Sequence, residues 1–201
     1  HSAIRYGVTQ ACLDAVAKSQ CKLMAQVIAD EYGTEVSKEI IPIFSQSGDD
    51  RYLNADKMIM KRADVLPHAL FNHVETKVGL KGEKIKEYVE WLRNRIIKLR
   101  PCECYNPTIH IDVYGTLGIV FNNDFEAIAK YIGEVAEIAK PFHLRVEGPV
   151  DMGEKKAQIE ALAAIRAAMD RDGIDAEIVA DEWCNTLEDI VDFSKEKSGH
   201  M

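Results

Sequence analysis

Three acidic residues, Asp112, Glu147 and Asp181, end short apolar stretches in the second half of the chain. They close the sequences TIHID, LRVE and EIVAD, at intervals of 35 and 34 residues. Short apolar stretches rich in β-branched residues are typical of strands. Three carboxylates that converge repel one another unless a cation lies between them, and oxygen ligands suit Mg²⁺. We therefore predict a magnesium site with these three residues as ligands.

The elements between the acids alternate between strands and helices about every 35 residues. This alternation is typical of parallel βα units, in which the carboxyl ends of neighbouring strands share one edge of the sheet. Both an open doubly wound sheet and a (β/α) barrel fit it. No Gly-rich phosphate loop follows a strand, and a barrel rim is where active sites are built, so we favour the barrel. The predicted strands are 108–115, 142–148 and 176–183, and the predicted helices are 84–99, 124–140, 154–172 and 186–197.

The first part of the chain is less regular. One or two helices are predicted over 2–32, ending at Gly33, followed by a strand and polar loop over 39–50 and a helix over 54–64. The segment 64–72 stays ambiguous because Pro67 interrupts regular elements.

A blander interpretation of an acid after a strand is a helix N-cap. Asp112 and Glu147 precede their predicted helices by twelve and seven residues, and Asp181 precedes Thr186 by five. None of the three is well placed to cap a helix. Their common position in three successive units therefore favours the metal site.

Composition narrows the class of protein. The chain has 201 residues, of which 47% are hydrophobic and 29% charged, as in globular proteins. A net charge of −8 argues against nucleic acid or an anionic membrane as the main partner, and no apolar run approaches the length of a membrane span. Five cysteines without a framework spacing predict reduced thiols in a cytoplasm. The absence of an initial Met and the ending SGHM suggest a fragment of a longer protein.

Several motifs together resemble the methylaspartate ammonia-lyases of the enolase superfamily. They are QSGDDRY, ADVLPHAL, HIDVYGT, FHLRVEGP and VADEWCNT, and the resemblance extends over essentially the whole chain. It implies an α/β fold, a partial TIM-type (β/α) barrel that lacks the capping domain and the last barrel strands. Residues 1–38 would form a helical lead-in, and 39–201 the incomplete barrel with the magnesium site.

The resemblance also implies an activity. The family converts L-threo-3-methylaspartate to mesaconate and ammonia in glutamate degradation, with Mg²⁺ and a monovalent cation such as K⁺, as a homodimer. Asp112, Glu147 and Asp181 match its magnesium ligands, Gln46 a glutamine that contacts a substrate carboxylate, and His68 an active-site histidine that binds substrate and transfers protons. The family's principal base, a lysine, would lie beyond Met201, so we expect the chain alone to be inactive or nearly so.

Other chemistry-bearing residues have simpler interpretations. We expect His110 and His143 to pack within strands, and Cys102 and Cys104 to lie in a surface loop rather than at a zinc site. Glu182, next to Asp181, could support the metal site. Two alternatives stay open: another enolase-superfamily dehydratase, racemase or cycloisomerase, and a non-catalytic piece that binds metal or a partner protein.

Overall fold

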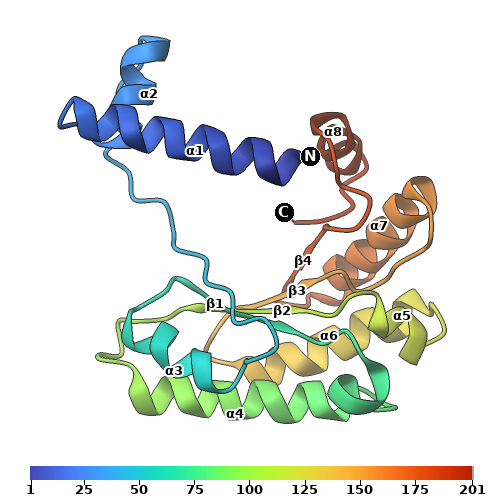
Figure 1. Ribbon diagram of the computed structural model, residues 1–201. Helices are drawn as coiled ribbons and strands as arrows, with labels where there is room; N and C mark the ends of the chain where they lie inside the picture. Colours follow the sequence, from blue (N-terminus) through green and yellow to red (C-terminus); the bar gives the residue numbers. More distant parts are fainter. Residues whose placement is uncertain (201) are drawn as a thin grey trace. The chain divides into compact units, whose positions relative to one another are not determined.

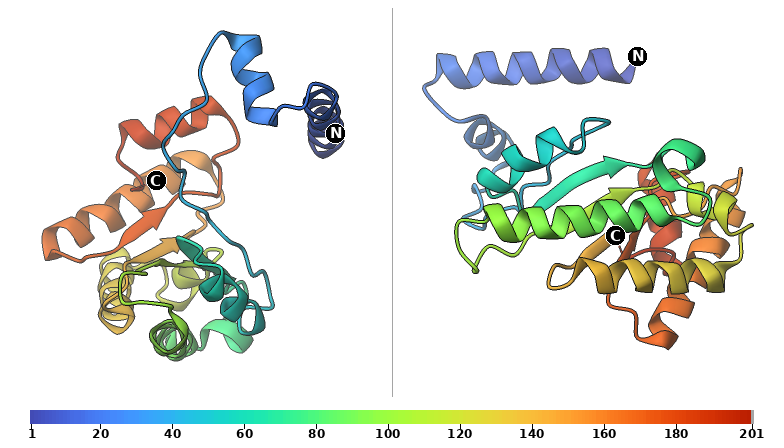
Figure 2. Two further views of the ribbon diagram at one scale, coloured as in Figure 1. Left: turned by 90° about the vertical axis from the view of Figure 1, so that its left-hand side faces the viewer. Right: turned by 90° about the horizontal axis from the view of Figure 1, so that it is seen from below.

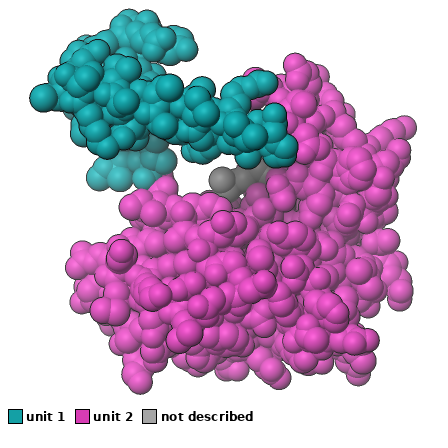
Figure 3. Space-filling view, in the orientation of Figure 1, with its two compact units in different colours: residues 1–41 teal, residues 42–201 magenta. Residues whose placement is uncertain are grey.

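A computed structural model describes residues 1–200, which form two compact units, His1–Ile41 and the remainder from Pro42 onward (Figure 3). The first unit consists of helices α1 (Ser2–Ser19) and α2 (Met24–Tyr32). Gly33 ends α2 in the left-handed conformation, with φ of 63°. A glycine is favoured there because it has no Cβ. The predicted helices and their stop at Gly33 are thus confirmed.

The second unit alternates strands and helices along the chain (Figure 1). Its elements are α3 (Leu53–Met60), β1 (Val65–Leu70), the π-helical turn η1 (Val74–Val78), α4 (Glu83–Leu99), β2 (Thr108–Asp112), α5 (Thr116–Val120), α6 (Phe125–Ala139), β3 (Leu144–Glu147), α7 (Lys155–Asp172), β4 (Glu177–Val179) and α8 (Leu187–Lys195). Asp124 caps α6 through its side chain, which accepts a hydrogen bond from the Ala127 N–H at 3.1 Å. The helix predicted over 124–140 therefore begins at a side-chain cap.

The four strands form one parallel sheet in the order β1-β2-β3-β4. Consecutive strands are neighbours, as expected for repeated βα units. Helices α4, α6 and α7 lie along one face of this sheet (Figures 1 and 2). The predicted α/β class with parallel strands is confirmed.

Strand alternation separates an apolar face of the sheet from a polar one. Ile109, Ile111 and Val146 are buried in the core, whereas their neighbours on β2 and β3 point to the opposite face. The helices supply the matching apolar stripes. On α4 the buried residues, which recur at helical spacing, are Ile85, Tyr88, Val89, Leu92 and Ile96. The polar face is therefore the one that presents the candidate site residues.

Before β2, the structure settles one segment that the sequence left ambiguous and corrects one prediction. The ambiguous segment around Pro67 is strand β1, in which the register against β2 shifts between Pro67 and Ala69. A proline fits here because the irregularity relieves it of a regular ladder bond. The strand expected within 39–50 is only a pair of isolated bridges, Phe44 with Val65 and Gly48 with Ala69. The turn η1 and helix α5, five residues each, are too short to show a period and were not predicted.

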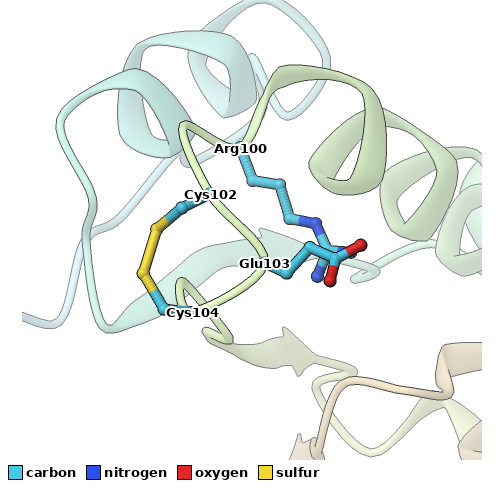
Figure 4. Close-up of a disulfide and its surroundings, with 4 residues drawn as sticks. All are labelled: Arg100, Cys102, Glu103 and Cys104. Atoms are coloured by element: carbon cyan, nitrogen blue, oxygen red, sulfur yellow. A yellow bond between two sulfur atoms is a disulfide. The ribbon is translucent and has the colours of Figure 1, made fainter.

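The prediction of five reduced cysteines is wrong for one pair. Cys102 and Cys104, in the loop after α4, form a disulfide with Cα atoms 5.2 Å apart (Figure 4). An odd cysteine count says nothing about a turn that brings two near neighbours within bonding distance. Cys12, Cys21 and Cys184 are free. No helix in residues 1–200 has both the length and the apolar character of a membrane span.

Candidate active site

Asp112 and Glu147 are neighbours at the carboxyl edge of the sheet. Asp112 is the last residue of β2 and Glu147 the last of β3, and the two are register partners. Both point to the polar face, and Asp112 is only 3% exposed. Two of the three predicted carboxylates are thus brought together, for the reason expected from parallel βα units.

Asp181 lies less regularly than predicted. β4 ends at Val179, the register partner of Glu147, so Asp181 is two residues past the strand and in an exposed loop. A turn follows at once, because the Cys184 N–H donates to the Asp181 carbonyl and Trp183 has a positive φ of 67°. Partial burial and the charge of Glu147 raise the pKa of the Asp181 carboxyl, so Asp181 is coupled electrostatically to Glu147.

His68 and Gln46 meet at the same edge. His68 lies at the irregularity in β1, with φ of 49° and 6% exposure, so its ring points inward from the strand. Its Nδ1 is 2.9 Å from Gln46 Nε2, and its Nε2 is 3.5 Å from Asp112 Oδ2. The bridge between Gly48 and Ala69 ties the Gln46 segment to β1. The structure therefore brings together both residues matched to substrate contacts.

Glu147 is held by two imidazoles. Its Oε2 lies 2.6 Å from His110 Nε2 and 3.1 Å from His68 Nε2. Burial acts to raise the Glu147 pKa, but the hydrogen bonds from the two histidines outweigh it and lower the pKa to about 2. The hydrogen bond to Glu147 likewise raises the pKa of His68. An ionised carboxylate only accepts hydrogen bonds, so both imidazoles donate through Nε2–H.

His110 is the site residue that the sequence did not reveal. It was expected to pack within its strand, and it is indeed only 4% exposed, but its ring contacts Glu147. The available signal was the period of two: His110 and Asp112 project from the same face of β2. Phe44 covers both histidines, with ring centroids 5.3 Å from His68 and 4.8 Å from His110.

The site has more carboxylates than cations. Burial and the charge of Glu147 raise the pKa of Asp112 to about 7, and burial, with added repulsion from Asp181, raises that of Glu182 to about 7. Glu182 Oε2 is buried and has no hydrogen-bond partner among residues 1–200. A Cβ at Gly148 would lie only 2.6 Å from Glu182 Oε1, so glycine makes room for this carboxylate. Buried oxygens with an unmet charge are what a hard cation such as Mg²⁺ satisfies.

The loops that carry the acids are joined to one another. The Gly115 N–H donates to the Gly148 carbonyl at 2.7 Å, and the Gly148 N–H donates to the Val179 carbonyl at 3.1 Å. Trp183, two residues after Asp181, donates from Nε1 to Asp151 Oδ1 at 3.1 Å. These bonds link the ends of β2, β3 and β4 and restrict how far their carboxylates can separate.

Fold and site together define an α/β protein of parallel βα units, with a carboxylate and histidine cluster at the carboxyl edge of the sheet. Residues 35–201 match the model of the methylaspartate ammonia-lyase C-terminus, and residues 1–33 that of the N-terminus. The chain belongs to the methylaspartate ammonia-lyase family.

Individual relatives agree with this assignment. The methylaspartate ammonia-lyase of Clostridium tetanomorphum is 61% identical over 201 residues, which are 100% of this chain and 49% of that protein. The enzyme of Citrobacter amalonaticus is 52% identical over 100% of this chain and 49% of its own length. The chain thus spans about half the length of the curated relatives it matches.

Two solved structures are similar in fold. One is the magnesium complex of β-methylaspartase from Clostridium tetanomorphum, with a TM-score of 0.88 and 61% identity, covering 100% of this chain and 49% of that one. The other is the Citrobacter amalonaticus lyase containing (2S,3S)-3-methylaspartic acid, with a TM-score of 0.90 and 52% identity at the same coverage. Both structures, like the sequence relatives, are of methylaspartate ammonia-lyases.

Proposed function

We propose that this chain forms part of an ammonia-lyase that converts L-threo-3-methylaspartate to mesaconate and ammonia in glutamate degradation. The observation that carries the proposal is the carboxylate and histidine cluster at the carboxyl edge of the sheet, in a chain 61% identical to a methylaspartate ammonia-lyase. The 3-methylaspartic acid in the Citrobacter structure supports the substrate class, a small amino acid.

Asp112, Glu147 and Asp181 are the proposed ligands of Mg²⁺. Their oxygen donors suit this ion, and the raised pKa values of Asp112 and Asp181 mark carboxylates that gain from a nearby cation. The magnesium complex of the Clostridium relative supports the choice of metal. When bound, Mg²⁺ stabilises negative charge that develops on a substrate carboxylate as the adjacent carbon loses its proton.

The other side chains orient substrate and hold protons. Gln46 presents an amide at the exposed side of the cluster and binds a substrate carboxylate through its N–H groups. His68 lies between Gln46 and Glu147, in hydrogen-bond contact with both, so its Nε2 proton is held at the edge of the site. His68 is thus the proposed group for proton transfer on one face of the substrate. The principal lysine base of the family would be supplied from outside residues 1–201.

The finer architecture is also a proposal. Four consecutive parallel strands with helices along one face support a TIM-type (β/α) barrel, of which residues 39–201 form an incomplete part and 1–38 the helical lead-in. The capping domain and the last barrel strands would lie outside these residues. From the family resemblance we further infer a homodimer and a monovalent cation such as K⁺ for the whole enzyme. A cytoplasmic location is inferred from the cysteines, of which Cys12, Cys21 and Cys184 are free.

The test is a chimera in which residues 1–201 replace the matched half of the Clostridium lyase. We expect release of ammonia from 3-methylaspartate in the presence of Mg²⁺, and loss of activity when Asp112→Asn is introduced. The 201-residue chain alone is the matched control and should release little ammonia. A folded chimera that binds Mg²⁺ but leaves 3-methylaspartate unchanged would contradict the proposed activity.

A further inference from the structure

Two imidazole nitrogens and a carboxylate oxygen converge beside the proposed magnesium ligands. His68 Nε2, His110 Nε2 and a Glu147 oxygen all lie within 4.8 Å of one another, and the two ring centroids are 5.2 Å apart. Mg²⁺ prefers oxygen ligands and has little need of these nitrogens. Zn²⁺, in contrast, is commonly bound by histidine nitrogens together with a carboxylate.

We propose that His68, His110 and Glu147 form a second metal site, which binds a borderline transition-metal ion such as Zn²⁺ and shares Glu147 with the proposed magnesium site. Zinc binding stands on these three residues alone. The expected competition between Zn²⁺ and Mg²⁺ rests on the proposed function, because both ions would require Glu147.

The present distances are close to those of a coordinated ion. Ligand atoms about 2.0–2.2 Å from one metal lie roughly 2.8–3.1 Å from their neighbours in octahedral geometry and roughly 3.3–3.6 Å in tetrahedral geometry. His68 Nε2 is already 3.1 Å from Glu147 Oε2, whereas His110 Nε2, at 2.6 Å, must move away by about 0.2–1 Å. Asp112 Oδ2 is 3.5 Å from His68 Nε2 and stays with the proposed magnesium site.

The two histidines are held in place before any ion arrives. Both are almost fully buried, and Phe44 packs against both rings. His68 is on β1 and His110 is on β2, two adjacent paired strands, so the backbone also restricts their separation. Little ordering remains to oppose metal binding, which favours affinity.

The orientation of the Gln46 amide determines whether His68 Nε2 donates a hydrogen bond to Glu147 or binds a metal ion. With Gln46 Nε2 donating to Nδ1, as here, the imidazole proton is on Nε2 and points at Glu147. Metal binding needs the Nε2 lone pair, so the proton must be on Nδ1 and the amide must turn to present Oε1 as acceptor. Zn²⁺ binding thus requires the Nε2 protons of both His68 and His110 to leave those nitrogens, either to Nδ1 or to solvent, and it rotates one amide, without breaking the fold.

The experiment is a ZnCl₂ titration of the 201-residue chain, followed by calorimetry and by NMR of ¹⁵N-labelled histidine side chains. We expect Zn²⁺ to shift the Nε2 resonances of His68 and His110, and Mg²⁺ to leave both unmetallated. Excess Mg²⁺ should weaken the apparent Zn²⁺ affinity. The measurement on the unsubstituted chain needs no variant, so it decides the proposal even if a variant fails to fold.

Variants separate the contribution of the His110 imidazole to metal binding from that of its hydrogen bond to Glu147. His110→Gln keeps a donor for Glu147 but removes the imidazole, so the ratio of Zn²⁺ to Mg²⁺ affinity should fall at least about tenfold. Gln46→Glu, which stabilises the proton on Nδ1 of His68, should raise Zn²⁺ affinity. The matched control is His143→Gln, a histidine outside the site, which should leave the ratio unchanged.

Three results would overturn the proposal: no Zn²⁺ binding, unmoved Nε2 resonances in the Zn²⁺-bound chain, or equal Zn²⁺ to Mg²⁺ ratios in the unsubstituted and His110→Gln chains. Failure of the magnesium site gives a different pattern. In that case Zn²⁺ still shifts both histidines, but Mg²⁺ neither binds nor competes.

Discussion

Two carboxylates on the polar face of the sheet have contrasting surroundings. Glu177, at the start of β4, is the register partner of Arg145 and is paired with its guanidinium. Burial would raise the Glu177 pKa, but Arg145 outweighs it and holds the pKa below its usual value. Glu147 lies two residues further along β3, at the carboxyl edge, where its neighbours are Asp112 and two imidazoles. There, burial and the charge of Glu147 raise the pKa of Asp112 to about 7.

The difference shows that the chain supplies a cationic partner for Glu177, whereas the carboxylates at the carboxyl edge need a bound cation. A half-buried carboxylate beside a guanidinium has its counter-charge supplied by the chain. Clustered carboxylates without such a partner store repulsion, which a bound cation can relieve. The amino end of this face is therefore structural, and the carboxyl edge is suited to binding.

The largest expected effect is the change with pH in the free energy of unfolding of the metal-free chain. Because the pKa of Asp112 is raised in the folded state, the folded chain binds more protons than the unfolded one between pH 4 and 7. The free energy of unfolding should therefore fall as pH rises through this range, by up to about 4 kcal/mol. The lowered pKa of Glu147 acts with the opposite sign, but only as pH falls below about 4.5.

Urea unfolding at pH 5 and pH 7, with and without Mg²⁺, measures this effect. Mg²⁺ should restore stability at pH 7 and do little at pH 5, and Asp112→Asn should flatten the pH dependence. Equal stability of the metal-free chain at both pH values would remove the evidence for stored repulsion at the carboxyl edge.

The second effect is on metal affinity. Glu147→Gln removes a proposed ligand and should weaken Mg²⁺ binding at least about 100-fold, whereas Glu177→Gln, at the other end of the same face, should change it less than about twofold. Isothermal titration calorimetry of both variants gives the comparison directly. Similar losses in the two variants would mean that the ends of this face do not differ as we describe.

A smaller effect, on stability, is expected when the ion pair between Arg145 and Glu177 is broken. Arg145→Met leaves Glu177 without its guanidinium, and because both side chains are only partly buried, the loss of stability should be about 1–2 kcal/mol. Thermal unfolding measures the loss, and Mg²⁺ affinity should be unchanged. A second substitution, Glu177→Met in the same chain, should recover part of the stability.

The smallest effect is expected at His143. This histidine is 3.5 Å from Glu177 and 3.7 Å from Asp175, and its side chain is 34% exposed, so His143→Gln should change stability by less than about 1 kcal/mol. His110→Gln, at a nearly buried ring, should cost clearly more in the same unfolding assay. Equal losses would show that burial of the histidines does not distinguish the two ends.

Much of the site could be predicted because its residues follow a regular period. Asp112 and Glu147 end strands of one βα repeat, so their proximity follows from parallel pairing. Asp181 was placed less accurately because the turn after β4, with Trp183 at positive φ, depends on contacts between loops. The Cys102–Cys104 disulfide was missed for a similar reason, since a local turn brings the sulfurs together.

The order of strands and helices, the apolar faces of the helices and the acids that end neighbouring strands all follow from the sequence. These features depend on hydrophobic periodicity and on residues that end helices and strands, and both are local properties of the chain. The tertiary structure was needed to show that Pro67 lies within a strand and that His68 and His110 meet on one oxygen of Glu147. It was also needed to show that Glu182 Oε2 has no hydrogen-bond partner within residues 1–200. These contacts join residues as many as 79 positions apart, and their geometry depends on strand register and packing rather than on any local pattern.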